Sequence, residues 1–361
     1  MKAAEVGRAA RPAGLGLGLL AAGAAAGWLG ERFLVRRGPG SAALSLTGFG
    51  TLHAEPRLLR TDDDVELYVE VDEAGPQARY APLTVVFVHG YALNLDCWHF
   101  QRQALHGDVR SVYLDLRGHG RSGLGSRESH TVERLGADLR ELLATVAPHG
   151  PVVLVGHSMG GIALMAVAEQ EPELFQGPVV GVGLLCTSSG GLTGPSLGLP
   201  RGLATVVRKA APGTLRLVDK VPGGVVTRVR RSGSDLGHLF TRFYAFASHV
   251  PAGLTDFAGE MLAATPLEVL ADYLPEFDTH DKGDDIPAFR EAASLVVGAR
   301  QDLMIPVEHS VALSEALPDA ELVIADPGGH LVLLEQPDQV TEALRRLFDR
   351  SLEVARSRGL A

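Results

Sequence analysis

Cysteine is scarce in this sequence, and positive charge is not in excess. These two features argue against a disulfide-stabilised or cysteine-based metal-binding protein and against a nucleic-acid-binding protein. Only Cys97 and Cys186 occur in 361 residues, so a disulfide framework is excluded, and no Cys/His spacing typical of a metal site is present. We expect both cysteines to be small core residues rather than a redox pair. The net charge of −10 gives no general reason to expect nucleic-acid binding.

Apolar residues and glycine are abundant. Hydrophobic residues make up 46% of the chain, and 43 residues are glycine, a composition that suits a packed enzyme. A chain of 361 residues can form one large α/β domain with an insertion, or two small domains.

Residues 12–30 carry no charged side chain and would just span a bilayer. The stretch is mainly Ala and Gly, so its insertion would be marginal. Three interpretations stay open: an uncleaved anchor, a signal peptide with a cleavage site at Ala24-x-Ala26, or a flexible leader. We therefore expect a membrane-associated or exported protein, with a cytoplasmic location as the alternative.

A strand, a sharp turn and a helix are predicted around Ser158. Four apolar residues, 152–155, indicate a buried parallel strand, and Gly156-His157-Ser158-Met159-Gly160 follows directly. Such a turn exposes its central side chain above the sheet and tolerates only small neighbours, a demand that Gly156 and Gly160 meet. Ser158 is therefore the candidate nucleophile.

This motif resembles the nucleophile elbow of the α/β-hydrolase superfamily of serine esterases and lipases, and the resemblance covers about residues 57–350 apart from a divergent middle. It implies an α/β-hydrolase fold, a mostly parallel sheet covered by helices on both faces, with an inserted helical cap. It also implies an oxyanion hole formed by the backbone N–H groups of Met159 and Tyr91, since His89-Gly90-Tyr91 ends an earlier strand.

The order of strand and helix patterns supports this interpretation. An antiparallel hairpin is predicted at 57–60 and 65–71. Buried strands are predicted at 83–88, 152–155 and 293–297, and further strands at 111–115, 179–185 and 321–325. The predicted helices are 96–105, 131–146, 242–249, 266–273 and 337–356. We divide the chain into a leader (1–48), a first core part (49–186), a cap or lid insertion (187–285) and a second core part (286–361).

Asp302 is the candidate acid, because it lies just past the predicted strand 293–297 and matches the family's Gly-x-x-x-Asp-x-x-x-Pro loop. The alternative acid position of some relatives is occupied here by residues 186–189, which contain no carboxylate. The competing carboxylates lie in a polar linker, where solvation explains them: Asp278, Asp281, Asp284 and Asp285.

His330 is the candidate base, in a Gly-Gly-His loop between the last strand and the last helix. The order Ser158, Asp302, His330 is the one expected of this fold. His119 lies in a glycine turn before the nucleophile and is interpreted as a hydrogen-bonded turn residue, and His89 as structural.

Two charged stretches have alternative interpretations. The run from Asp62 to Asp64 could suggest a metal site, but it lacks complementary ligands and is interpreted as a solvated turn. Residues 201–231 carry a net charge of +7 with interleaved apolar residues. A soluble cap with a basic face is favoured over a segment that lies on an anionic membrane.

The sequence thus predicts a serine hydrolase of carboxylic esters that needs no cofactor or metal, with a small-molecule ester or lipid as substrate and a preference for medium or long acyl chains. Amidase or peptidase, thioesterase, carbon–carbon hydrolase and cofactor-free perhydrolase activities use the same groups. A membrane-associated binding protein that retains the fold without chemistry is the non-enzyme alternative.

Overall fold

The computed structural model describes residues 48–148, 150–192, 213, 241–242 and 244–361. The apolar stretch 12–30 and the charged residues of the basic stretch 201–231 lie outside the described residues. Within the described part of the chain, no helix is both long and apolar enough to cross a membrane.

Eight strands form one sheet in the order β1-β2-β4-β3-β5-β6-β7-β8. The first three in that order pair antiparallel and all later neighbours pair parallel, which confirms the predicted hairpin and the mostly parallel sheet. The strands are β1 Pro56–Arg60, β2 Glu66–Asp72, β3 Thr84–Val88, β4 Arg110–Leu114, β5 Val152–His157, β6 Val179–Leu185, β7 Ala293–Ala299 and β8 Glu321–Ala325.

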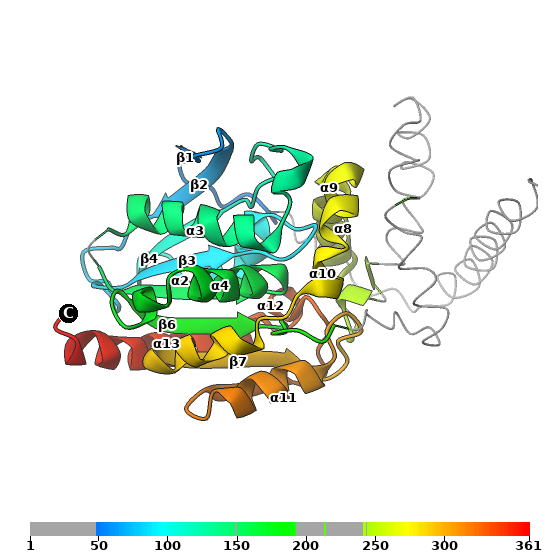
Figure 1. The fold of residues 1–361 in the computed structure, drawn as a ribbon. Helices are drawn as coiled ribbons and strands as arrows, with labels where there is room; N and C mark the ends of the chain where they lie inside the picture. The colour runs from blue at the N-terminus through cyan, green and yellow to red at the C-terminus, as the bar shows by residue number, and fades with distance from the viewer. Residues whose placement is uncertain (1–47, 149, 193–212, 214–240, 243) are drawn as a thin grey trace, which may run out of the picture.

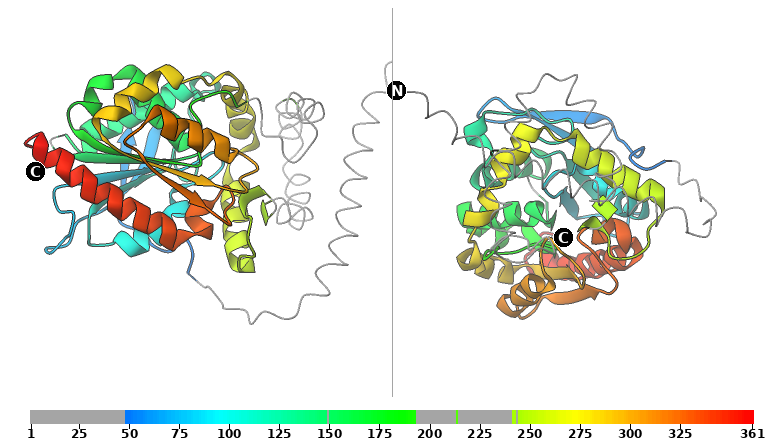
Figure 2. Two further views of the ribbon diagram at one scale, coloured as in Figure 1. Left: turned by 90° about the horizontal axis from the view of Figure 1, so that it is seen from below. Right: turned by 90° about the vertical axis from the view of Figure 1, so that its right-hand side faces the viewer.

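Helices cover both faces of the sheet, as Figure 2 shows. Side chains alternate along β3: Val85 and Phe87 join the core under one helical layer, whereas Val86 and Val88 join the core under the other. The first layer contains α2 His99–Leu105 and α13 Pro337–Ser357, and the second contains α3 Val132–Val146, α4 Met159–Gln170 and α11 Val307–Ala316.

A third group of helices lies beside the end of the sheet to which the parallel strands point (Figure 1). These are α8 Ala252–Ala264, α9 Leu267–Tyr273 and α10 Glu276–Thr279, followed by the 3₁₀ helix Gly283–Glu291. Helix α9 matches its prediction, but the helix predicted over 242–249 ends at Ala245, and α8 was not predicted. Apolar residues of α8 pack in the α13-side core and those of α9 in the α3-side core.

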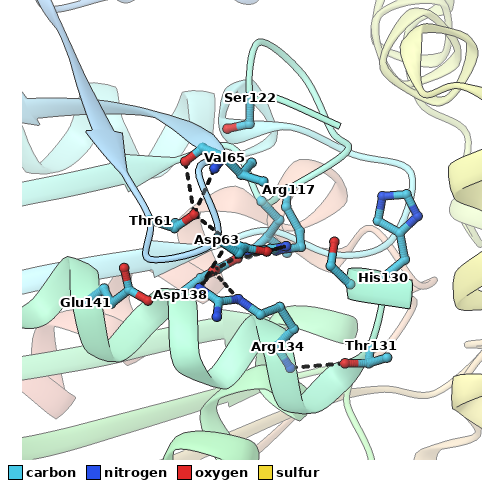
Figure 3. A network of polar contacts seen from close by, with 12 residues as sticks. Thr61, Asp63, Val65, Arg117, Ser122, His130, Thr131, Arg134, Asp138 and Glu141 are labelled. Carbon is cyan, nitrogen blue, oxygen red and sulfur yellow. Dashed lines mark hydrogen bonds and ion pairs between the residues drawn. The ribbon is translucent and has the colours of Figure 1, made fainter. Parts of the chain in front are cut away.

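A buried charged cluster fixes the aspartate turn between β1 and β2 (Figure 3). The fully buried Arg117 guanidinium donates to both oxygens of Asp138 at 2.6 Å and to those of Asp63 at 2.8 and 3.0 Å. Arg134 also bonds Asp138, at 3.1 Å. We call Asp63, Arg117, Arg134 and Asp138 the Arg117 cluster.

The cluster corrects part of the interpretation of the aspartate run as a solvated turn. The side chains of Asp62 and Asp64 are exposed, but Asp63 holds a buried arginine through a bidentate pair. The hydrogen bond from Arg117 lowers the pKa of Asp63. Nothing in the described ranges groups three or more His, Cys, Asp or Glu side chains so that they could hold a metal ion.

Candidate active site

Ser158 occupies a strained turn between strand β5 and helix α4. Its φ of +53° and ψ of −119° lie outside the ordinary regions for a residue with a side chain. The turn is possible because its neighbours are glycines: a Cβ on Gly156 would lie 2.6 Å from the carbonyl carbon of Gly160. Ser158 follows the central strand β5 at its carboxyl end, and the residue keeps 8% of its surface exposed, which leaves limited access to solvent.

The structure brings Asp302 and His330 to this serine, although they are distant from it in sequence. His330 Nδ1 lies 2.8 Å from Asp302 Oδ2, and His330 Nε2 lies 3.0 Å from Ser158 Oγ. Because an ionised carboxylate only accepts hydrogen bonds, Nδ1 carries the proton and Nε2 is left to accept the serine hydroxyl. This is the arrangement of a nucleophile, a base and an orienting acid.

Asp302 is held rigidly in the loop after β7. Its Oδ1 accepts hydrogen bonds from the backbone N–H groups of Met304 at 2.8 Å and Ile305 at 2.9 Å, and its side chain is fully buried. These two donors fix the orientation of the carboxylate and leave Oδ2 directed at His330.

The loop that carries His330 is anchored on both sides. Gly329 N donates to Glu335 Oε2 at 2.6 Å, and Leu331 N donates to the carbonyl oxygen of Ala245 at 2.9 Å. Glu335 ends helix α12 Val332–Glu335 and also accepts backbone N–H groups from the segment after Ala245. Sequence reasoning missed Glu335, although a carboxylate that closes an apolar run before Pro337 is a usable signal.

The two predicted oxyanion donors lie near Ser158: Met159 begins helix α4 directly after it, and Tyr91 follows Gly90, which lies against the Ser158 side chain. In the described part of the chain, neither Tyr91 N nor Met159 N donates to a recorded acceptor, and Met159 is the first residue of helix α4, where such N–H groups have no helical partner. The Tyr91 hydroxyl donates to the carbonyl oxygen of Leu270 in α9 at 2.7 Å, and its ring packs edge-on against Phe277. The loop of Tyr91 is therefore in contact with helices α9 and α10.

The other histidines that the sequence raised do not reach the serine. His89 uses Nδ1 toward the Gly90 carbonyl and Nε2 toward Leu116 N, and it is completely buried. His119 Nδ1 lies 3.0 Å from the carbonyl oxygen of Arg117, and burial lowers its pKa to about 4. His119 is hydrogen-bonded within its turn and His89 is a buried residue directly after β3, which agrees with their interpretation as a turn residue and a structural residue.

A second serine–histidine contact lies beside the site. Ser188 Oγ lies 2.8 Å from His309 Nδ1 and 2.7 Å from the carbonyl oxygen of Gly190. Because a carbonyl only accepts, the Ser188 proton goes to Gly190 and the hydroxyl accepts from His309. The pair is a structural brace between the loop after β6 and helix α11, and it has no free base.

The competing acids and the cysteines differ in how near they lie to this site: Cys186 lies against the Asp302 carboxylate, and burial together with this carboxylate raises the pKa of its thiol. Asp278, Asp281 and Asp284 are exposed. Cys97 and Cys186 are free and buried in the same core cluster. Burial raises the pKa of both thiols, which makes them poor nucleophiles.

Comparison with known proteins adds independent information. The model of the "Alpha/beta hydrolase family" matches residues 85–343. A protein of Rhizobium rhizogenes named "Putative carbamate hydrolase RutD" is 27% identical over 280 residues, which are 75% of this chain and 94% of that protein.

Solved structures of known proteins are also similar to this chain. A thermophilic esterase from Thermogutta terrifontis aligns with a TM-score of 0.61 and 25% identity, covering 82% of this chain and 99% of the esterase. A bromoperoxidase from Bacillus anthracis aligns with a TM-score of 0.61 over 82% of this chain and 100% of its own, and at 20% identity it shows the fold alone.

Proposed function

Because the chain belongs to the alpha/beta hydrolase family, we propose that it is a serine hydrolase of carboxylic esters, with Ser158 as nucleophile, His330 as general base and Asp302 as the acid that orients the base. The observation that carries the proposal is the chain of two hydrogen bonds, 2.8 and 3.0 Å long, from Asp302 through His330 to a serine in a strained turn.

The reaction follows from these positions. His330 Nε2 removes the hydroxyl proton as Ser158 Oγ attacks the ester carbonyl, and then delivers that proton to the leaving alcohol. Asp302 keeps Nδ1 protonated and stabilises the imidazolium. Water, activated by the same base, then hydrolyses the acyl-enzyme.

The Tyr91 and Met159 N–H groups would hold the oxyanion of each tetrahedral intermediate. Removal of one such donor costs about 3–4 kcal/mol in comparable sites. Backbone donors need no proton transfer and no side-chain reorganisation, which suits a site where negative charge develops briefly.

We propose that helices α8–α10 form the inner part of a cap over the site and help to select the acyl group. Two contacts support this: Tyr91 is bonded to Leu270 of α9, and Phe277 of α10 packs on the Tyr91 ring. An apolar cap favours medium or long acyl chains over acetate.

Carbamate hydrolysis is the second candidate, and the similarity to the Rhizobium rhizogenes protein favours it. A carbamate carbonyl would pass through the same tetrahedral intermediate at the same donors. The two activities differ in the group attached to the carbonyl, which the cap would select.

The test uses the full chain with nitrophenyl esters of increasing acyl length and with a nitrophenyl carbamate. Wild type, Ser158→Ala and Ser188→Ala are compared, since Ser188 also contacts a histidine but has no free base. We expect Ser158→Ala to lose about 10⁴- to 10⁶-fold in kcat while Ser188→Ala stays active. Equal activity in wild type and Ser158→Ala would overturn the proposal. Faster hydrolysis of the nitrophenyl esters favours the ester hydrolase, and faster hydrolysis of the nitrophenyl carbamate favours the carbamate hydrolase.

A further inference from the structure

The residue before the nucleophile contacts the base directly. His157 Nε2 lies 2.9 Å from the main-chain carbonyl oxygen of His330, and the centroids of the two rings are 4.9 Å apart. His157 ends strand β5, so the strand that presents Ser158 also reaches the loop that presents His330.

The hydrogen-bond pattern fixes the tautomer of His157. Since a carbonyl oxygen only accepts, Nε2 donates and Nδ1 carries no proton. Nδ1 is buried and has no partner among the described residues. A buried acceptor without a partner costs stability, so an apolar side chain would serve the core better than histidine at this position.

The space around His157 is closed on its other side by the oxyanion loop. A Cβ on Gly90 would lie 2.8 Å from His157 Nδ1 and 3.0 Å from Ser158 Cβ. The His157 ring therefore fills the gap between the loop of Tyr91 and the loop of His330, and it contacts both.

We propose that His157 is a positioning residue, whose Nε2–H holds the His330 main chain so that the imidazole stays within hydrogen-bond distance of Ser158. The inference rests on the proposed function, because it assigns His157 a role through the base of that reaction. Next to His330, Gly329 is anchored by Glu335 and Leu331 by Ala245, whereas His157 joins the base itself to the nucleophile's own strand.

The charge state of His157 agrees with this role. Complete burial, followed by the proximity of His330, lowers the pKa of His157 to about 3. The ring is thus neutral when His330 takes up a proton during catalysis, and it adds no repulsion to the imidazolium.

Two amide variants separate positioning from packing. In His157→Gln the side-chain amide nitrogen can reach the place of Nε2 and donate to His330, whereas in His157→Asn it reaches only the place of Nδ1. We expect His157→Gln to retain at least about a fifth of the wild-type kcat and His157→Asn to lose about 10- to 100-fold, with KM changed less than about threefold in both. Active-site titration with an organophosphonate normalises the rates to competent sites.

Equal kcat in the two variants, or a loss confined to KM, would overturn the inference. Crystal structures of both variants give a readout that needs no activity: the His330–Ser158 distance of 3.0 Å is kept in His157→Gln and lengthened in His157→Asn. An unchanged distance in His157→Asn overturns the positioning role. Failure of the proposed function is seen separately, as wild-type hydrolysis that does not depend on Ser158.

Discussion

The Arg117 cluster and the Ser158 site are both built from buried ionisable side chains. They differ in whether a proton can pass from one side chain to another. In the Arg117 cluster, three guanidinium nitrogens are bonded to the carboxylates of Asp63 and Asp138, and every proton stays on the arginine. In the Ser158 site, a single histidine bridges a carboxylate and a hydroxyl, and its side chain keeps 12% of its surface exposed.

The difference lies in the affinity of the groups for protons. An arginine does not lose its proton in proteins, so a cluster centred on it can only hold the backbone in place. A histidine can gain and lose a proton, so a histidine placed between a carboxylate and a hydroxyl can transfer one. Buried charge alone therefore does not mark the reactive site, and the following predictions test this distinction.

The largest effect is expected from removal of the base. His330→Gln should lower kcat by at least about 10⁴-fold, because His330 is the base that contacts Ser158 Oγ among the residues that the structure describes, while the free energy of unfolding changes by less than about 1 kcal/mol. Steady-state kinetics and urea unfolding provide the two measurements. His309→Gln is the matched control and should remain active, and comparable losses in both variants would argue against His330 as the base.

The opposite pattern is expected for the Arg117 cluster. Arg117→Met leaves the Asp138 carboxylate buried with less compensation and should lower the free energy of unfolding by about 3–5 kcal/mol, with kcat per titrated site unchanged. Urea unfolding and active-site titration test this. The triple variant Asp63→Ala, Arg117→Met, Asp138→Leu should recover much of the stability, and a selective loss of kcat in Arg117→Met would contradict a purely structural cluster.

The Arg117 cluster and the Ser158 site also differ in how much of each could be predicted from the sequence. Strand β8 and the strand before Ser158 were predicted because an unbroken apolar run needs no tertiary information, and Asp302 and His330 were named from their loops. The ion pair between Asp63 and Arg117 joins residues 54 apart and leaves no local pattern, so the aspartate run was interpreted as solvated throughout. The catalytic roles of Ser158, Asp302, His330, Tyr91 and Met159 stay predictions.

The role of Glu335 and the position of helix α8 also depend on contacts between segments that are distant in the sequence. A carboxylate that accepts backbone N–H groups is recognised by what surrounds it in space, and Glu335 takes its donors from the nearby Gly329 and from Ala247, which is 88 residues away. Helix α8 packs a mixed face of small and large residues, so its periodicity is weak in the sequence. Local patterns predict the elements, whereas contacts between distant segments need the fold.

A third prediction concerns acid stability. Burial lowers the pKa of His119 to about 4 and that of His157 to about 3, and it also lowers that of His89. Above pH 6.5, which is about the pKa of a histidine in the unfolded chain, all three side chains are neutral in both the folded and the unfolded state. Below that pH, the unfolded chain binds protons at these histidines and the folded protein does not. The free energy of unfolding should therefore fall as the pH decreases from about 6.5 to 4.

Asp115 has the opposite effect on the free energy of unfolding. Burial raises its pKa to about 6, so as the pH falls the folded state binds this proton before the unfolded state does. The net loss should still exceed about 1.4 kcal/mol per pH unit between pH 6 and 5, because three histidines outweigh one carboxylate. Urea unfolding across this range measures the slope. Asp115→Asn should make the slope steeper, and constant stability would show that the buried histidines are protonated in the folded protein.

The smallest effect is expected at the edge of the Arg117 cluster. The Asp62 side chain is 70% exposed, and its ion pair with Arg134 is open to solvent. Asp62→Asn should change the free energy of unfolding by less than about 1 kcal/mol, in contrast to Asp63→Asn, which removes a charge from the buried arginine. Equal losses in the two variants would contradict the assignment of Asp63 as the structural member of the run.

The most direct test of the Ser158 site is covalent labelling of the full chain with a fluorophosphonate, followed by peptide mapping. We expect one phosphonate on Ser158, no label in Ser158→Ala, and labelling slowed by orders of magnitude in His330→Gln because the base no longer activates the hydroxyl. Absence of labelling in the wild type, or a label that persists in Ser158→Ala, would contradict the role of Ser158 as nucleophile.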